Sequence, residues 1–267
     1  MHVMSSVDVE AVQRSLAHDG YAVIKDVVAK AGLSELSALL AQEYEQAKAT
    51  GGLFQGGGSV SGHLNCFPGE RSRFVYDDIR RRGILDVVRS IDPEAVDDVR
   101  VTMNYNLPGS APQFYHSDGL YTDAFLICNV AVVDTNLTNG AMDVLPGTNR
   151  EFYKFWRYAL ERKYRLTTRV CLEQGDVLLR VSTLWHRGMP NLSQAPRPLM
   201  SLTFGEKGRP EGDPFMVNDG KVAFYPNWFN TNRLGRLRER SFVSLPWTYS
   251  AYRFARSLYG NKGYSSW

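Results

Sequence analysis

The stretch VRVTMNY, residues 99–105, alternates apolar and polar side chains and is rich in residues that favour β-strands. Downstream runs of similar character occupy residues 125–133, 141–145, 176–180 and 199–204. Asn139-Gly140 and Pro146-Gly147 separate some of these runs as turn signals. Many short strands broken by such turns predict a mainly β protein whose core is a barrel or jelly roll of antiparallel strands.

Helical patterns come before this β-rich part of the chain. The predicted helices span residues 7–18, 33–47 and 78–91, with apolar side chains at helical spacing. Ser34 is the expected N-cap of the second helix, and residues 21–24 form a short strand after the stop signal Asp19-Gly20. The Gly-rich run at 51–62 lacks the Lys-Ser/Thr ending of a phosphate-binding loop, so we expect a mobile loop and a candidate lid.

The pattern along the chain predicts one domain over residues 1–267, a length that can bury a full core. Within it we expect a helical N-terminal part with the Gly-rich loop (1–98), the jelly-roll core (99–205) and a C-terminal extension (206–267).

The end of the chain is basic and aromatic. Residues 225–267 hold seven basic side chains, one acid (Glu239) and eleven aromatic side chains, although the whole chain carries a formal charge of only +3. One interpretation is a segment that lies on a membrane surface or on an anionic partner. The other is a tail that packs its aromatic side chains on the body and leaves its arginines in solvent.

Composition excludes several classes of protein. No apolar run reaches membrane-spanning length, and the first eight residues lack the charged and apolar regions of a secretory signal. Cys66, Cys128 and Cys171 are odd in number and widely spaced, which argues against a disulfide framework or a metal finger. We therefore expect a cytoplasmic protein.

Histidine is scarce, which narrows the choice of metal ligands. The five histidines are His2, His18, His63, His116 and His186. The first two fall at a chain end and a helix end, whereas His116 and Asp118 are two apart and would share one face of a strand. His186 ends the strand predicted to begin at residue 176. Two imidazoles and one carboxylate form the ligand set of the facial triad that holds non-haem Fe(II).

Arg197 adds a candidate co-substrate site to this candidate metal site. Taken alone, His116 could be a surface turn histidine and His186 a core histidine satisfied by a hydrogen bond. Arg197, however, opens a predicted strand and would point into a largely apolar barrel. A buried guanidinium needs an anion, and no acidic residue lies near Arg197 in sequence. A dicarboxylate co-substrate would supply that anion through paired hydrogen bonds.

Together these motifs resemble the phytanoyl-CoA dioxygenase family of Fe(II)- and 2-oxoglutarate-dependent oxygenases. The likeness extends over about residues 10–205 and includes the motifs His116-Ser117-Asp118, Asn139-Gly140, Gly175-Asp176, Trp185-His186 and Arg197. The sequence Thr148-Asn149-Arg150 departs from the Ser-His-Arg of the family, but that histidine is not a metal ligand. The resemblance implies a double-stranded β-helix, the form of jelly roll that this family uses.

The resemblance also implies roles for individual residues. His116, Asp118 and His186 would hold Fe(II), on which the C1 carboxylate and C2 oxygen of 2-oxoglutarate would bind, while its C5 carboxylate would pair with Arg197. Candidates for hydrogen bonds to the co-substrate are Asn104 and Asn129, with the alternative that both are satisfied locally on their strands. Weaker candidates for contact with the substrate are His63 and Asn65.

We therefore expect a hydroxylase that uses O₂, acts on an unactivated C–H bond, and releases succinate and CO₂, with ascorbate as an optional additive in vitro. The carboxylate of Asp118 favours hydroxylation or another plain oxidation over halogenation, because related halogenases have a small residue at this position. The substrate classes are a small biosynthetic metabolite and a lipid-linked compound, such as a lipid-linked sugar, met at the inner face of the membrane through residues 225–267.

The alternative function is a non-catalytic, cupin-like jelly-roll module that binds a metal or ligand. A nucleic-acid partner is not expected, because the basic residues lie in the tail and not in a stripe across the core. The sequence predicts no oligomeric state. Residues 51–75 and 205–267 match no family motif, so we expect substrate choice to be set there.

Overall fold

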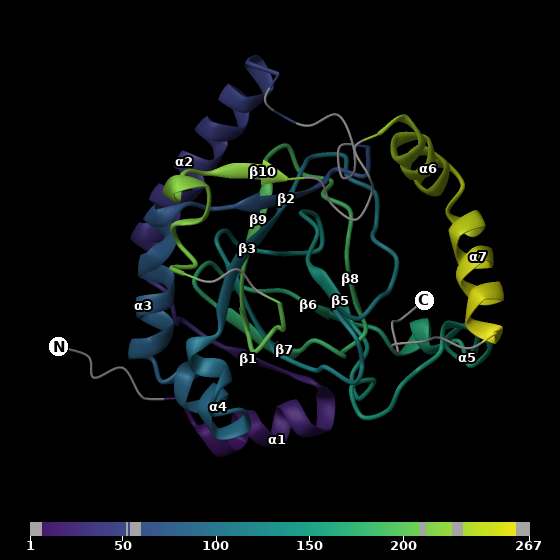
Figure 1. The fold of residues 1–267 in the computed structure, drawn as a ribbon, viewed down its shortest axis with the longest axis horizontal. Coiled ribbons are helices and arrows are strands. Elements are labelled where there is room, and N and C mark those ends of the chain that lie inside the picture. The colour runs from purple at the N-terminus through teal and green to yellow at the C-terminus, as the bar shows by residue number, and fades with distance from the viewer. Residues whose placement is uncertain (1–6, 52, 54–59, 209–211, 226–231, 260–267) are drawn as a thin grey trace.

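Two antiparallel sheets form the core of the chain in a computed structural model that describes residues 7–51, 53, 60–208, 212–225 and 232–259 (Figure 1). In pairing order the larger sheet contains β1 (Tyr21–Ile24), β7 (Val177–Val181), β4 (Leu126–Ala131), β9 (Arg197–Phe204), β3 (Val99–Asn106), β2 (His63–Phe67) and β10 (Ala223–Tyr225). The smaller sheet contains β6 (Thr168–Val170), β5 (Met142–Val144) and β8 (His186–Gly188). The predicted jelly roll is confirmed.

The two sheets pack against each other through an apolar cluster. Ala131, Leu178 and Leu199 of the larger sheet meet Val144 and Val170 of the smaller one. Successive strand residues point to opposite faces, so the neighbours of these residues point away from the smaller sheet. The space between the sheets therefore receives alternate side chains of β3, β4, β7 and β9.

Helices cover the other face of the larger sheet. They are α1 (Val9–Asp19), α2 (Lys30–Ala49), α3 (Arg73–Arg81) and α4 (Ile84–Ile91). Figure 1 shows α2 and α3 at the left of the molecule and α4 and α1 along its lower edge. Their apolar side chains, among them Leu16, Leu33 and Ile79, share one buried cluster with Val101 and Met200 of the sheet. This layer buries one face of the larger sheet, so the opposite face of that sheet borders the space between the sheets.

The N-terminal predictions need three corrections. Ser34 is not an N-cap, because α2 begins at Lys30 and the Ser34 hydroxyl donates a hydrogen bond to the Lys30 carbonyl at 3.0 Å. The helix predicted over 78–91 is two helices, α3 and α4, because Gly83 between them adopts a left-handed φ of 80°. Strand β2 was not predicted. Most of the predicted Gly-rich lid, residues 52 and 54–59, lies outside the described residues.

The C-terminal extension is helical, as predicted. Its helix α7 (Pro246–Leu258) lies beside α5 (Phe155–Leu160), and α6 (Arg233–Ser244) packs on α7, opposite the first helical layer (Figure 1). The Trp156 amide at α5 donates to the Ser257 hydroxyl of α7 at 3.0 Å. Short 3₁₀ turns occur at Glu70–Ser72, Ala95–Asp97, Lys163–Leu166 and Val217–Gly220. Of the helices described, none has the length and apolarity needed to cross a bilayer.

Candidate metal centre

His116, Asp118 and His186 meet at one edge of the space between the sheets. Each offers one ligand atom, and these atoms all lie within 4.8 Å of one another. An Asp118 carboxylate oxygen lies 3.7 Å from His116 Nε2, and the other lies 3.5 Å from His186 Nε2. The structure therefore brings together the three residues that the sequence proposed as metal ligands.

Backbone pairing sets this arrangement. His116 lies in the connection between β3 and β4, and its amide and carbonyl pair with those of His186 at 2.9 and 2.8 Å. The Asp118 amide donates to the Ser182 carbonyl at 2.8 Å. The expectation that His186 ends the strand begun at residue 176 was wrong. That strand, β7, ends at Val181, and His186 opens β8 in the other sheet.

Hydrogen bonds orient both imidazole rings. His116 Nδ1 lies 2.7 Å from the Phe114 carbonyl oxygen, and His186 Nδ1 lies 3.0 Å from the Leu184 carbonyl oxygen. A carbonyl only accepts, so each Nδ1 carries the hydrogen and each Nε2 keeps its lone pair for a metal. Such orientation by a partner behind the ring is typical of metal-binding histidines.

Charge and burial favour the protonation states that bind a cation. Burial lowers the pKa of His116 and lowers that of His186 well below its usual value, so both rings are neutral at pH 7. Burial raises the pKa of Asp118, but Arg180 and the two histidines outweigh it and hold that pKa below its usual range. The three groups therefore offer two neutral nitrogens and a carboxylate to a divalent metal.

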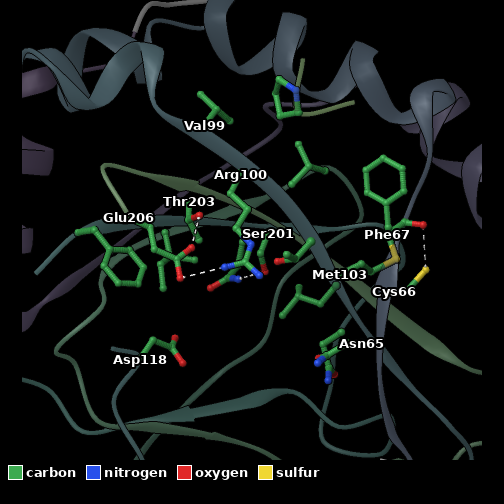
Figure 2. A pocket seen from close by; sticks show the side chains of 18 of the residues that line it. Asn65, Cys66, Phe67, Val99, Arg100, Met103, Asp118, Ser201, Thr203 and Glu206 are labelled. Carbon is green, nitrogen blue, oxygen red and sulfur yellow. Dashed lines mark hydrogen bonds and ion pairs between the residues drawn. The ribbon is translucent and has the colours of Figure 1, made fainter. Parts of the chain in front are cut away.

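The cluster lines a cavity of about 720 Å³ between the sheets. Figure 2 shows Asp118 and Asn65 on one side of this cavity and Arg100, Thr203 and Glu206 on the other. Two further candidates from the sequence, Asn104 and Asn129, also line it, as does Arg197. A cavity of this size accommodates a small organic molecule.

His63 is not brought into this cavity. Its ring is buried, its Nε2 lies 2.7 Å from the Ala111 carbonyl oxygen, and it faces a second cavity of about 290 Å³ beside α6. A side-chain hydrogen bond joins His63 to Asn104 of β3. His63 therefore does not line the larger cavity, and its link to that cavity is its hydrogen bond to Asn104, which does line it.

Arg197 has the geometry of an anion-binding residue. Its side chain is 2% exposed, and its Nη2 donates to the Gly140 carbonyl at 3.0 Å. Nε and Nη1 are buried and have no partner within the described part of the chain. Burial lowers the pKa of Arg197 to about 10, which still leaves a cation at pH 7. Two unpartnered N–H groups on one buried guanidinium fit the terminal carboxylate of a dicarboxylate such as 2-oxoglutarate.

Gly140 explains the Asn139-Gly140 signal in physical terms. Gly140 has a φ of 88°, and an added Cβ would lie 2.5 Å from Asn106 Nδ2 and 2.7 Å from the Met189 carbonyl oxygen. Only glycine allows this tight approach, which places the Gly140 carbonyl against Arg197.

Asn129 follows the local alternative that the sequence left open. Its Nδ2 donates to the Ser201 hydroxyl at 2.7 Å, and its Oδ1 accepts from Arg180 Nε at 2.8 Å. Sequence reasoning missed Arg180, although an arginine inside the apolar strand Val177–Val181 was a usable signal. A charged side chain in such a strand needs a buried partner, and the partner here is Asp118.

Comparison with known families agrees with this site. A model of the phytanoyl-CoA dioxygenase (PhyH) family matches residues 16–199 of the chain. That family consists of oxygenases that use Fe(II), 2-oxoglutarate and O₂, and the matched region contains all three candidate metal ligands and Arg197.

Solved structures share the fold at low sequence identity. The non-heme alpha ketoglutarate dependent epimerase SnoN from nogalamycin biosynthesis is 16% identical, with a TM-score of 0.55 over 82% of this chain and 85% of SnoN. The carbocyclase SnoK from the same biosynthesis is 14% identical, with a TM-score of 0.56 over 88% of this chain and 94% of SnoK. HygX from Streptomyces hygroscopicus, solved with nickel and 2-oxoglutarate, is 13% identical, with a TM-score of 0.55 over 76% of this chain and 89% of HygX.

Proposed function

The chain belongs to the phytanoyl-CoA dioxygenase family, and from this premise we propose that it is an Fe(II)- and 2-oxoglutarate-dependent hydroxylase of a small molecule. One observation carries the proposal. The cluster of His116, Asp118 and His186 shares a cavity with Arg197, a buried guanidinium with two unpartnered N–H groups in the described structure.

The residues of the chain have separate tasks in this proposal. His116, Asp118 and His186 hold the metal, and Arg197 holds the far carboxylate of 2-oxoglutarate. The iron, 2-oxoglutarate and O₂ together supply the oxidising chemistry that attacks a C–H bond and releases succinate and CO₂. Apolar side chains of the cavity lining, such as Met142 and Leu199, would position the C–H bond near the metal.

The outcome of the oxidation is the finer part of the proposal. SnoN is an epimerase and SnoK a carbocyclase, so this fold serves more than one outcome. The carboxylate of Asp118 occupies the third ligand position, which leaves no room there for a halide and supports oxygen insertion over halogen transfer. Hydroxylation of a C–H bond is the simplest outcome of oxygen insertion.

The charges of the cavity support an uncharged substrate. Its charged side chains in the described structure balance, with cations Arg100, Arg180 and Arg197 and anions Asp118, Glu206 and Asp213. Fe(II) and the 2-oxoglutarate dianion also cancel, so the loaded cavity has no net charge. A polyanionic substrate such as an acyl-CoA would lack compensating cations there. Amide and hydroxyl groups of Asn65, Thr102 and Ser201 instead suit a neutral compound with hydroxyl groups, such as a glycoside.

The C-terminal helices support a separate proposal about location. Leu234, Leu237 and Trp247 are 75%, 61% and 66% exposed. The acid of α6, Glu239, is fully buried and accepts a hydrogen bond from the Ser61 amide, so the described outer face of α6 and α7 is apolar and basic. That combination favours an anionic membrane, and we place the protein in the cytoplasm with peripheral contact at the inner face of the membrane.

Turnover of 2-oxoglutarate tests the proposed function. Purified protein with Fe(II), 2-oxoglutarate, O₂ and a panel of neutral glycosides should release succinate, measured by mass spectrometry. The hydroxylated product should be heavier than its substrate by about 16 mass units, the mass of one oxygen atom. His186→Ala should abolish succinate release, whereas His18→Ala, at an exposed surface position, should not. Metal binding without any succinate would contradict the proposal and indicate the non-catalytic binding module instead.

A further inference from the structure

Arg180 is a second buried arginine in the same cavity. It lies on β7, where Val177 and Leu179 pack into the helix-covered cluster and Leu178 faces the smaller sheet. The alternation of a strand therefore directs Arg180 to the same side as Leu178, into the cavity. The side chain is 4% exposed.

Two hydrogen bonds hold the guanidinium plane of Arg180. Its Nη2 donates to an Asp118 carboxylate oxygen at 2.6 Å, and its Nε donates to Asn129 Oδ1 at 2.8 Å. Asn129 is itself held by the Ser201 hydroxyl at 2.7 Å. The third nitrogen, Nη1, is buried and meets no partner in the described residues. One edge of a fixed, buried cation is thus open for a hydrogen bond.

The charge at the metal centre shows what Nη1 would bind. Without metal, the carboxylate of Asp118 compensates Arg180. Fe(II) adds two positive charges against this same single carboxylate, because the other two ligands, His116 and His186, bind a metal through neutral imidazole nitrogens. With Fe(II) bound and before 2-oxoglutarate enters, the metal centre therefore has excess positive charge beside an unused N–H donor, which is the environment that a carboxylate prefers.

We propose that Arg180 binds, through Nη1, the carboxylate of 2-oxoglutarate that lies at the metal. This inference rests on the proposed function and adds a second anchor to it. Arg197 holds the C5 end of the co-substrate and Arg180 the C1 end, so a dicarboxylate is recognised at both ends. A substrate carboxylate could in principle use the same donor, and the experiment below separates the two sources.

Anaerobic calorimetry at saturating Fe(II) tests the proposal with two ligands. 2-Oxoglutarate carries both carboxylates, and 2-oxopentanoate keeps the C1 end but lacks the C5 carboxylate. Arg180→Gln should weaken both ligands by about 10- to 100-fold, since it removes a charge-assisted hydrogen bond to C1. Arg197→Gln should weaken 2-oxoglutarate by a similar factor and leave 2-oxopentanoate unchanged.

Controls separate this role from a structural one. Fe(II) affinity is measured independently for each variant, because Arg180 also contacts Asp118. Arg180→Lys, which keeps the charge, should recover part of the lost affinity for both ligands. Arg89→Gln removes an exposed arginine of α4 that pairs with Asp86 at 2.7 Å, outside the cavity, and should leave binding of both ligands unchanged.

Two results would overturn the inference. One is an Arg180→Gln variant that, with Fe(II) saturated, binds 2-oxopentanoate as tightly as the unaltered protein. The other is unchanged co-substrate binding with a raised KM for substrate, which would assign Arg180 to a substrate anion. If the unaltered protein binds no 2-oxoglutarate with Fe(II), the proposed function itself fails.

Discussion

His63 shows how burial of a single side chain makes stability depend on pH. It is 1% exposed, and burial, opposed in part by its hydrogen bond to the Ala111 carbonyl, lowers its pKa to about 4. In the unfolded chain its pKa is about 6.5. Between these values the unfolded state binds the proton and the folded state does not, so stability falls as pH decreases.

We predict that, as the pH is lowered, the free energy of unfolding decreases more steeply in the unaltered protein than in His63→Asn. From about pH 7 to about pH 5, His63 alone should cost about 2 kcal/mol, because its unfolded form is protonated and its folded form is not. Urea denaturation with a chelator present, at both pH values, measures this. Equal losses in the two proteins would contradict the low pKa of His63.

At the residue scale, the sequence predicted the residues that have strong chemical constraints. Because histidine is scarce, few other metal ligands could be chosen than His116, Asp118 and His186. Arg197 stood out as a charged residue in a predicted apolar strand. The same argument applied to Arg180 but was not made, because its anion partner lies 62 residues away in the chain. Contacts that close only in the folded state are invisible to local patterns.

At the scale of elements, Asp143 joins the three strands of the smaller sheet. It is 1% exposed on the central strand β5 and lies opposite Arg169 of β6 and Arg187 of β8. Arg187 Nε donates to its carboxylate at 3.0 Å, and Arg169 Nε donates to the other oxygen. Since β8 begins at His186, this ion-pair network also fixes the position of a metal ligand.

We predict that Asp143→Asn lowers the free energy of unfolding by about 3 kcal/mol, because it leaves two partly buried arginines without a carboxylate. Metal affinity should fall as well, because β8, which carries the ligand His186, loses its ion pair to β5. Urea denaturation and metal titration measure the two effects. Asp86→Asn, which removes a pair with Arg89 on the exposed face of α4, should cost less than about 1 kcal/mol. Similar stability of both variants would argue against a structural role for the network.

Elements with strong local patterns were predicted, and those that depend on distant pairing were not. Strand β1 occurs at the predicted residues, and α1 ends where Gly20 adopts a left-handed φ of 84°. Strand β2 lacks clear alternation and exists because β3 and β10 pair with it from distant parts of the chain. The break between α3 and α4 could not be predicted, because a glycine such as Gly83 can either end a helix or be tolerated within it.

At the scale of the whole molecule, the two groups of helices have different tasks. The N-terminal helices cover the larger sheet. On the opposite side α7 packs on α5 (Figure 1), and its residues Tyr249 and Arg253 line a small cavity together with His116 and Asp118. Arg253 of α7 is 1% exposed and lies over the rings of Phe155 and Trp185, at 4.1 and 5.9 Å from the ring centroids. Removing the C-terminal helices would therefore uncover apolar core, and their outer face is better tested by point substitutions.

We predict that the protein co-sediments with vesicles that contain phosphatidylglycerol and not with neutral phosphatidylcholine vesicles. Combined substitution of Leu234, Leu237 and Trp247 by serine should abolish co-sedimentation, because the exposed apolar contact is lost. Raising the salt concentration should weaken it, since each arginine near an anionic surface contributes about 1 kcal/mol that is screened. Leu137→Ser with Leu192→Ser is the matched control, because these leucines are 67% and 70% exposed in loops outside the C-terminal helices. Co-sedimentation that survives the triple substitution but not the control would place the membrane contact on those loops instead.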